Sequence, residues 1–407
     1  MGDTVAIVGA GHAAGQVVAT LKQKKFDGNI ILIGEESWLP YQRPPLSKKF
    51  LAGELPAERL HFKPQNFYDD PCIEVRLDTR VDAIDRVGKT LQTANGEQLT
   101  FDNLVFATGA RPRLLDLPGA SLNGVHYLRT IADVIGIQEQ LKAGARLAIV
   151  GAGYIGLEVA AVAAQLGADV TVIEMEDRVM SRVVSPQISE FYQQEHIAHG
   201  VKLMLSTGIS GFNGDEHVTA VELSNGEQVA ADLVVIGIGV VPNTELASDA
   251  GLEVENGIVV DDHCQTSDPS IFAVGDCTHH PNDILGYRVR LESVHNALEQ
   301  AKTAASNICG EESSYAQVPW FWSDQYDLKL QIAGLSQGYD QAIVRGNPDS
   351  RSFSCLYLQN GQLIAVDAVN SPKDFMQSKA LIAAHAVIDP TALANPDTEL
   401  KNMEVLA

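Results

Sequence analysis

The feature that most constrains this chain is a glycine-rich turn that occurs twice, each time between a strand-like and a helix-like segment. The first copy, GAGHAA at 9–14, follows a β-branched run at 4–8 and precedes a helical pattern that ends near residue 24. The second copy, GAGYIG at 151–156, follows an apolar run at 147–150 and precedes a similar helical pattern. A βαβ unit that recurs within one chain predicts two related domains.

Each turn has the spacing that is typical of dinucleotide binding. Its first glycine permits the tight turn, the second lets a pyrophosphate approach the backbone, and the small third residue lets the helix pack on the strand. The N–H groups and the dipole at the start of the helix then bind the phosphates. The residues in these positions are Gly9, Gly11, Ala14, Gly151, Gly153 and Gly156.

A carboxylate ends the second strand of each unit, about 20 residues after the turn. Glu35 and Glu174 occupy these positions and can accept hydrogen bonds from a ribose. Glu174 would also repel a 2′-phosphate, so it favours NADH over NADPH, although Arg178 lies close enough in sequence to weaken that preference. Two fingerprints in series indicate two dinucleotides, and FAD with NADH is the natural pair.

A third carboxylate follows the strand pattern at 271–274. Gly275-Asp276 places it beside a glycine turn, where it could bond the ribitol chain of a flavin. Such a turn is common by itself, but after two dinucleotide fingerprints it supports a bound flavin.

Size and composition set the class of protein. A chain of 407 residues with 45% hydrophobic residues predicts a globular α/β protein of two or three domains. A net charge of −23 argues against a nucleic-acid partner. Because no apolar run reaches the roughly 20 residues of a membrane span and the N-terminus has no basic targeting pattern, we expect no membrane association and a cytoplasmic location.

These patterns predict an α/β fold with two Rossmann-like dinucleotide-binding domains and a smaller C-terminal α+β domain. A polar, turn-rich segment at 310–317 separates the last domain from the rest of the chain. This domain has several strand-like segments followed by a helix near Lys379. The predicted division is a discontinuous FAD-binding domain at 1–115 and 240–315, an NAD-binding domain at 116–239 and a C-terminal interface domain at 316–407.

Eight segments spread over essentially the whole chain form a longer pattern. They are GAGHAAG at 9–15, LPYQRPPLSK at 39–48, FATGARPR at 106–113, GAGYIGLEVAA at 151–161, GIGVVPN at 237–243, AVGDC at 273–277, ESVHNALEQA at 292–301 and PWFWSDQY at 319–326. This pattern resembles the FAD-dependent ferredoxin reductases of the glutathione-reductase superfamily, in particular the putidaredoxin reductase type. The last segment is far more specific than any glycine motif.

The resemblance implies roles for residues that match the family. Lys48 and Glu158 resemble the family's charge pair beside the isoalloxazine and are the candidate catalytic residues. The positions at which the family contacts FAD hold Ala13, Glu35, Arg43, Lys48, Val81, Arg129, Asp276 and Val294. The positions at which it contacts NADH hold Gly153, Ile155, Glu158, Glu174 and Gly239.

The cysteines separate this chain from other members of the superfamily. Relatives on this fold reduce a disulfide or a peroxide through cysteines beside the flavin, and a thiolate relay requires such a thiol. None of Cys72, Cys264, Cys277, Cys309 and Cys355 lies in a CxxC or CxxxxC spacing. Electrons are therefore expected to leave the flavin singly, for a one-electron carrier.

The function implied is an NADH-dependent ferredoxin reductase. A hydride passes from NADH to a non-covalent FAD, and single electrons pass to a 2Fe–2S ferredoxin that feeds an oxygenase, either a haem-thiolate monooxygenase or a Rieske dioxygenase. Two alternatives remain open, a monodehydroascorbate reductase and a redox-responsive flavoprotein scaffold. The ferredoxin is expected to dock through a local basic and aromatic surface, for which the candidates are Arg290, Lys302, Lys329, Trp320 and Trp322.

Overall fold

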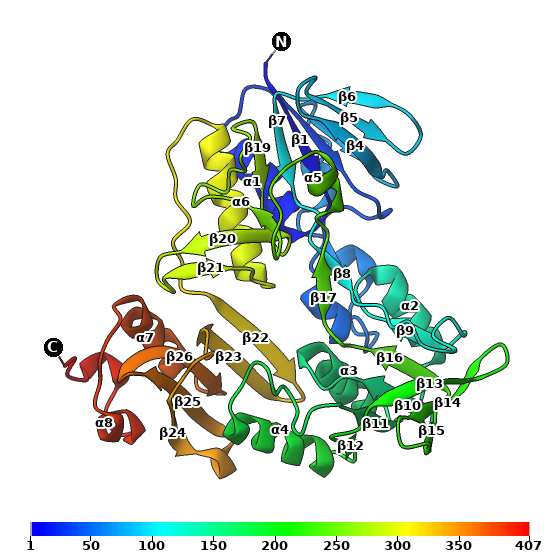
Figure 1. Cartoon of the computed structure of the whole chain (residues 1–407), viewed down its shortest axis with the longest axis vertical. Coiled ribbons are helices and arrows are strands. Elements are labelled where there is room, and N and C mark those ends of the chain that lie inside the picture. Colours follow the sequence, from blue (N-terminus) through cyan, green and yellow to red (C-terminus); the bar gives the residue numbers. More distant parts are fainter. Residues whose placement is uncertain (1, 407) are drawn as a thin grey trace. The chain divides into compact units, whose positions relative to one another are not determined.

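The computed structural model describes residues 2–406, which divide into two compact units (Figure 1). Unit 1 contains the chain up to Arg43, Glu58–Arg111 and Val240–Pro319. Unit 2 contains Pro44–Ala57, Pro112–Gly239 and the chain from Trp320 onward. Each unit therefore consists of segments that are far apart in sequence.

The core of unit 1 is a parallel sheet with strand order β19-β7-β1-β2-β3. Its strands carry apolar side chains on both faces, as expected for a parallel sheet covered on both sides. They are β1 (Thr4–Val8), β2 (Asn29–Ile33), β3 (Ile73–Arg76), β7 (Asn103–Phe106) and β19 (Ile271–Ala273).

Two helices, α1 (His12–Gln23) and α6 (Val294–Ile308), cover one face of this sheet (Figure 1). Ser293 caps α6 by accepting a hydrogen bond from the N–H of Asn296. The buried face of α6 is made of small residues, which lets the helices pack closely on the sheet and on each other. These residues are Ala297, Ala301, Ala304 and Ala305.

The opposite face of the sheet packs against an antiparallel layer and a short helix. This layer contributes Leu91, Leu99 and Ala247 to a core shared with Ala6 and Val8 of the sheet. Its elements are β4 (Val81–Asp85), β5 (Thr90–Thr93), β6 (Gln98–Thr100) and α5 (Glu245–Asp249). The remaining strands outside the main sheets are β8 (Ala110–Pro112), β17 (Val240–Pro242), β18 (Ile258–Val259), β20 (Thr278–Asn282) and β21 (Tyr287–Val289).

Unit 2 repeats the parallel sheet, with strand order β12-β11-β10-β16-β9. One of its faces packs against an antiparallel layer through Phe212 and Val221. The sheet strands are β9 (Val125–Tyr127), β10 (Arg146–Val150), β11 (Asp169–Ile173), β12 (Lys202–Met204) and β16 (Leu233–Ile236). The other elements are α2 (Ile131–Gln140), α3 (Tyr154–Gln165), α4 (Pro186–Ala198), β13 (Ile209–Gly214), β14 (Val218–Leu223) and β15 (Gln228–Ala230).

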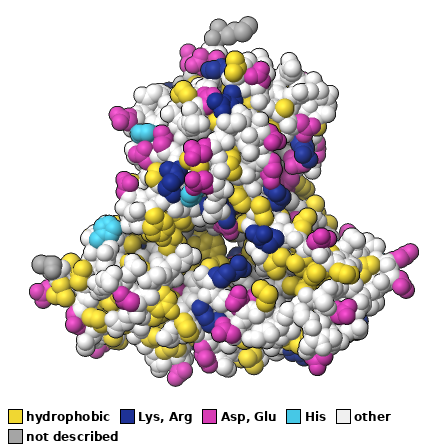
Figure 2. Space-filling model, viewed as in Figure 1, with side chains coloured by type: hydrophobic (Ala, Val, Ile, Leu, Met, Phe, Trp, Pro, Cys, Tyr) yellow, Lys and Arg dark blue, Asp and Glu magenta, His cyan; other side chains and the backbone are white. Residues whose placement is uncertain are grey.

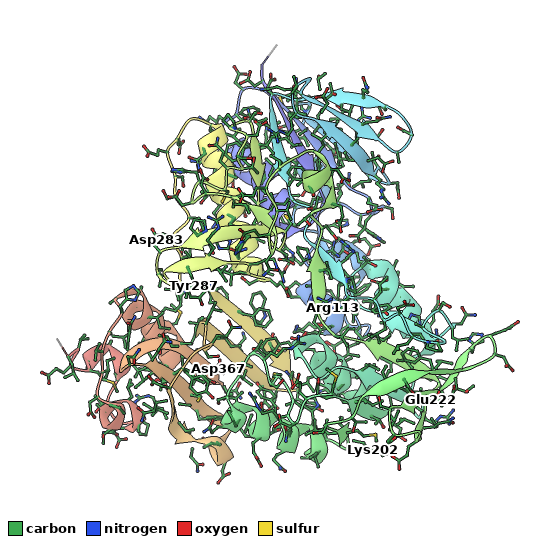
Figure 3. All side chains as sticks on the ribbon, viewed as in Figure 1. Arg113, Lys202, Glu222, Asp283, Tyr287 and Asp367 are labelled. Carbon is green, nitrogen blue, oxygen red and sulfur yellow. The ribbon has the colours of Figure 1, made fainter. Side chains whose placement is uncertain are left out.

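Unit 2 also contains the C-terminal antiparallel sheet, with strand order β22-β23-β26-β25-β24. Asp367 of this sheet, labelled in Figure 3, is fully buried, and burial raises its pKa to about 7 although the Tyr357 hydroxyl donates to it. The elements are β22 (Trp320–Gln325), β23 (Leu328–Gly334), β24 (Gln341–Asn347), β25 (Ser352–Gln359), β26 (Gln362–Val369), α7 (Pro372–Ala383) and α8 (Pro390–Ala394).

The predicted fold class is confirmed, with two parallel-sheet Rossmann-like layers and a C-terminal antiparallel sheet. The predicted three-domain division stays a prediction, and Pro44–Ala57, which it placed in the first domain, packs in unit 2. There, the side-chain amide of Gln138 donates to the carbonyl of Phe50. Short 3-10 helices lie at Pro44–Ser47, Ala57–Leu60, Gln65–Phe67, Pro348–Ser350 and Leu400–Asn402.

Within residues 2–406, no helix has both the length and the apolar character needed to cross a bilayer.

The contact between α4 and β22 contains a buried histidine. His196 is fully buried, with Nε2 at 2.8 Å from Oε1 of Gln325 and Nδ1 at 3.0 Å from the hydroxyl of Tyr326. Burial lowers its pKa to about 4, against the opposing effect of the Gln325 hydrogen bond. Because the folded pKa lies below the unfolded value of about 6.5, this group's contribution to stability is complete above that value and is lost as the pH falls toward 4.

Replacing this histidine should therefore flatten the acid side of the stability profile. Between pH 7 and pH 5, His196→Gln is expected to lose about 2 kcal/mol less unfolding free energy than the parent chain. Urea unfolding at both pH values measures this, with His385→Gln, a change at an exposed histidine outside this contact, as the control. Equal losses in the parent and in His196→Gln would contradict the assignment of a neutral buried imidazole.

Candidate dinucleotide sites

The two glycine-rich turns place the start of a helix in an open position. Gly11 is the N-cap of α1 and Gly153 is the N-cap of α3, and among the described residues no side chain caps either helix. A Cβ built on either glycine meets no described atom within 4 Å. The space beside each N-cap glycine is therefore open, and a helix start with open space beside it is the arrangement that binds a phosphate.

The first glycine of each turn is required by its backbone. Gly9 has φ of +114° and Gly151 has φ of +102°, values that favour glycine. An added Cβ would lie 2.1 Å from the carbonyl oxygen of Ala107 in the first turn and 2.5 Å from that of Gly237 in the second. The third position is equally close-packed, since a Cβ on Gly156 would lie 2.2 Å from the oxygen of Gly151.

In unit 1, Gly275-Asp276 follows β19 and lies beside the start of α1. A Cβ on Gly275 would lie 3.3 Å from the Cβ of Ala13 and 3.7 Å from that of Ala297, so the turn lies between α1 and α6. The side-chain oxygen of Gln300 accepts hydrogen bonds from the N–H of Gly275 at 2.8 Å and from the hydroxyl of Thr278 at 3.0 Å. Gln300 thus fixes the turn that carries Asp276.

Arg43 is brought near Asp276 and forms a cluster with neighbouring residues. Its guanidinium donates to Glu36 at 2.6 Å and to the hydroxyl of Tyr41 at 2.8 Å. Burial by itself would lower the pKa of Arg43, but Tyr41, Glu36 and Asp276 raise it above the ordinary value. The arginine therefore stays charged beside the predicted ribitol-binding carboxylate.

The other predicted flavin contacts occupy the ends of elements. Glu35 follows β2, is mostly exposed and lies 4.0 Å from Arg80. Val81 begins β4 and Val294 begins α6. Arg129 belongs to unit 2, where it precedes the capping box of α2, and its N–H donates to Asp133.

In unit 2, Glu174 is held against the glycine turn. Its carboxylate accepts from the N–H of Ala152 at 2.6 Å and from that of Glu176 at 3.0 Å. The guanidinium of Arg178 donates instead to the carbonyls of Val184 and Ser181 and to the hydroxyl of Ser189. These bonds turn the guanidinium of Arg178 toward its own loop.

Two further predicted NADH contacts lie in unit 2. Ile155, in the first turn of α3, is 40% exposed despite its apolar side chain. The carbonyl of Gly239 accepts from the N–H of Arg113, labelled in Figure 3. A Cβ on Gly239 meets no described atom within 4 Å, so space is open beside it.

The predicted catalytic pair, Lys48 and Glu158, is formed within unit 2. The Lys48 ammonium lies 2.6 Å from Oε2 of Glu158, whose side chain is 4% exposed. The hydroxyl of Ser47 donates to the same oxygen at 2.5 Å, and that of Ser323 donates to Oε1 at 2.7 Å. A buried ion pair requires this number of partners, because an unpaired buried charge is costly.

The sequence reasoning missed three residues at these sites, Gln300, Ser47 and Ser323. Gln300 is a fully buried polar residue on the face of α6 that is otherwise made of small residues. A glutamine among these buried alanines is the sequence feature that could have pointed to it. Ser47 and Ser323 lie inside the motifs at 39–48 and 319–326, but their shared partner, Glu158, is far from both in sequence.

The five candidate docking residues differ in their surroundings. Trp320 and Trp322 lie side by side, with ring centroids 5.5 Å apart. Arg290 lies 2.6 Å from Glu292, and Lys302 lies 2.6 Å from Glu299, so adjacent carboxylates offset both charges. Lys329 is exposed on β23. On the face shown in Figure 2, basic side chains lie among acidic ones.

Four of the cysteines lie in surroundings that disfavour a thiolate. Burial raises the pKa of Cys264, Cys277 and Cys309 above the ordinary value, and raises that of Cys355 to about 11. A thiol relay requires the opposite shift. Cys72 is exposed near the edge strand β3.

The comparisons with known proteins cover both parts of this architecture. The family described as pyridine nucleotide-disulphide oxidoreductase matches residues 3–301, and the reductase C-terminal family matches residues 320–404. The chain is 45% identical to the 5,5′-dehydrodivanillate O-demethylase ferredoxin reductase subunit of a Sphingobium species, over 98% of this chain and 97% of that protein. It is 43% identical to putidaredoxin reductase of Pseudomonas putida, over 98% and 96%.

Two solved structures of ferredoxin reductases are also similar to this chain. The crystal structure of the covalent putidaredoxin reductase–putidaredoxin complex matches with a TM-score of 0.95 and 43% identity, over 98% of this chain and 97% of that one. A ferredoxin reductase from Rhodopseudomonas palustris matches with a TM-score of 0.94 and 42% identity, over 98% and 99%. The chain belongs to the pyridine nucleotide-disulphide oxidoreductase family and carries the reductase C-terminal domain.

Proposed function

We propose that this chain is an NADH-dependent ferredoxin reductase, which uses FAD to pass single electrons to a 2Fe–2S ferredoxin of an oxygenase system. The observation that carries the proposal is the similarity, over nearly the whole chain, to proteins named as ferredoxin reductases in both sequence and structure. The similarity includes the C-terminal domain, where the specific segment at 319–326 lies.

The residues of unit 1 fit a flavin dinucleotide. The uncapped start of α1 offers N–H groups and open space to a pyrophosphate. Gln300 holds Gly275, and with it the turn that carries Asp276, where a ribitol chain could be bound. Arg43 adds a positive charge beside Asp276. A bound flavin supplies the conversion of a two-electron hydride into single electrons, which no side chain can perform.

The residues of unit 2 fit NADH. The start of α3 offers the second phosphate site, and Glu174 is oriented by the N–H of Ala152 to accept from a ribose hydroxyl. The Lys48–Glu158 pair would hold a positive charge beside the flavin ring in a fixed position. No proton transfer from this pair is needed for a hydride step.

The cysteine chemistry supports direct electron transfer to a one-electron carrier. Burial raises the pKa of four of the five thiols, so these four are poor nucleophiles at neutral pH. The terminal enzyme could be a haem-thiolate monooxygenase or a Rieske dioxygenase. We also propose a cytoplasmic location, the compartment expected from the sequence.

The function is tested with a purified 2Fe–2S ferredoxin. We expect the FAD-loaded protein to reduce it with NADH, and a variant with all five cysteines replaced by Ser or Ala to retain most of this turnover. Absorbance of the ferredoxin under anaerobic conditions measures the rate. Failure of the parent protein to reduce any 2Fe–2S ferredoxin would overturn the proposal, whereas loss of activity only in the FAD-replete cysteine variant would identify a thiol relay.

The two open helix starts provide a matched pair of variants. Gly11→Val should yield protein without FAD, because the branched side chain fills the space expected for the pyrophosphate. Gly153→Val should retain FAD but bind NADH at least tenfold more weakly. Flavin absorbance and NADH titration measure the two effects. Full FAD occupancy in Gly11→Val, or loss of FAD in both variants, would contradict the assignment of one nucleotide to each turn.

The nucleotide preference tests Glu174. Its carboxylate should bond the ribose 2′-hydroxyl of NADH, and losing such a bond costs about 1–3 kcal/mol. Glu174→Ala should therefore lower the ratio of kcat/KM for NADH to kcat/KM for NADPH by about 10- to 100-fold. The ratio of kcat/KM values measures it, with Asp177→Ala, a nearby exposed acid, as the control. An unchanged ratio would show that another residue discriminates.

A further inference from the structure

Strand β22 lies along the two helices of unit 2 that follow the second glycine turn. Its alternate residues point to that side, as the two-residue period of a strand requires. The Phe321 ring lies 4.8 Å from that of Tyr154, the Ser323 hydroxyl donates to Glu158, and Gln325 bonds His196. The C-terminal domain therefore contacts α3 within its first two turns.

Glu158 depends on this strand for one of its two carboxylate oxygens. Oε2 accepts from Lys48 and Ser47, whereas Ser323 is the one described donor to Oε1. Both Glu158 and Ser323 are buried, at 3% and 0% exposure, so water does not replace this bond. Hydrogen bonds to a buried charged group are among the strongest in proteins.

The direction of the Ser323 hydroxyl is set by a chain of hydrogen bonds. The Gln325 amide nitrogen donates to Oγ of Ser323 at 3.2 Å, which leaves the serine hydrogen for Glu158. The Gln325 oxygen, 2.8 Å from Nε2 of His196, then accepts from that nitrogen. Nδ1 of His196 is left to accept from the Tyr326 hydroxyl at 3.0 Å. Every donor in the chain Tyr326–His196–Gln325–Ser323 thus points toward Glu158.

We infer that Ser323 is a positioning residue for the Lys48–Glu158 pair, and that the chain from Tyr326 orients its hydroxyl. The inference rests on the proposed function for its effect on hydride transfer. Ser323 holds the carboxylate in one rotamer, and the carboxylate holds the ammonium of Lys48. The C-terminal domain in this way fixes the charge pair expected beside the flavin.

The kinetic test compares variants of the FAD-loaded protein. Ser323→Ala should slow flavin reduction at saturating NADH about tenfold, while the Kd for NADH changes less than twofold, because Ser323 does not bind the nucleotide. Ser323→Thr, which keeps the hydroxyl, should restore most of the rate. Ser378→Ala is the control, since Ser378 is a fully buried serine of the same domain whose hydroxyl has no partner among the described residues. Anaerobic stopped-flow absorbance of the flavin gives the rates.

A second measurement does not depend on activity. In urea unfolding of the oxidised FAD-loaded protein, Ser323→Ala should lower the urea concentration at the midpoint when it is introduced into the parent chain. It should leave this concentration unchanged when it is introduced into the Glu158→Ala variant. If Ser323→Ala loses its FAD, Ser323→Cys, of similar size with a weaker donor, replaces it in both measurements.

Equal midpoint shifts in the two backgrounds, an unchanged rate in Ser323→Ala, or a rate that Ser323→Thr does not restore would each overturn the inference. These results are distinguishable from failure of the proposed function. If the parent protein reduces no ferredoxin, the function is wrong, whereas the urea cycle still decides whether Ser323 holds Glu158.

Discussion

The structure depends on two helices, α1 and α3, that begin at a glycine and that no side chain of the described residues caps. A helix start normally requires a side-chain cap, and a glycine N-cap supplies none. In α1 and α3 the missing cap coincides with open space beside Gly11 and Gly153. This arrangement leaves room for an anionic ligand at the start of each helix, where the helix dipole favours negative charge. The parallel sheets, the close strand contacts at Gly9 and Gly151, and the small residues that follow all serve to hold these helix starts in place.

The second constraint is a buried charge. Glu158 lies on α3, and its carboxylate is stabilised by the segment at 44–57 and by the C-terminal sheet. A buried ion pair gains little net free energy unless each oxygen and each proton has a partner. The cost of leaving one partner unpaired links these three segments, so the C-terminal sheet contributes a hydrogen bond to the buried carboxylate.

The two glycine turns and the position of Glu174 beside the second turn could be predicted from local sequence, because each lies within a single βαβ unit. The expected strands at 4–8, 147–150 and 271–274 agree with β1, β10 and β19 to within one residue, and the helices expected after the two glycine turns are α1 and α3. Strands β5, β6 and β13–β15 of the antiparallel layers were not predicted, because such short strands carry a weak alternating pattern. The restraint of Arg178 by Val184 and Ser189 also depends on a loop that the spacing did not reveal.

The sequence by itself determined the two glycine turns, the carboxylates that follow them and the absence of a CxxC or CxxxxC spacing. Those features are local, so the physical requirements of a tight turn and an uncapped helix can be read from consecutive residues. Only the tertiary structure decided which side chains bind the buried carboxylate of Glu158 and which one holds the turn at Gly275. Ser47, Lys48 and Ser323 meet at Glu158, and Gln300 meets Gly275, because strands and helices distant in sequence pack together. Hydrogen bonds act over about 3 Å, and sequence separation carries no information about that distance.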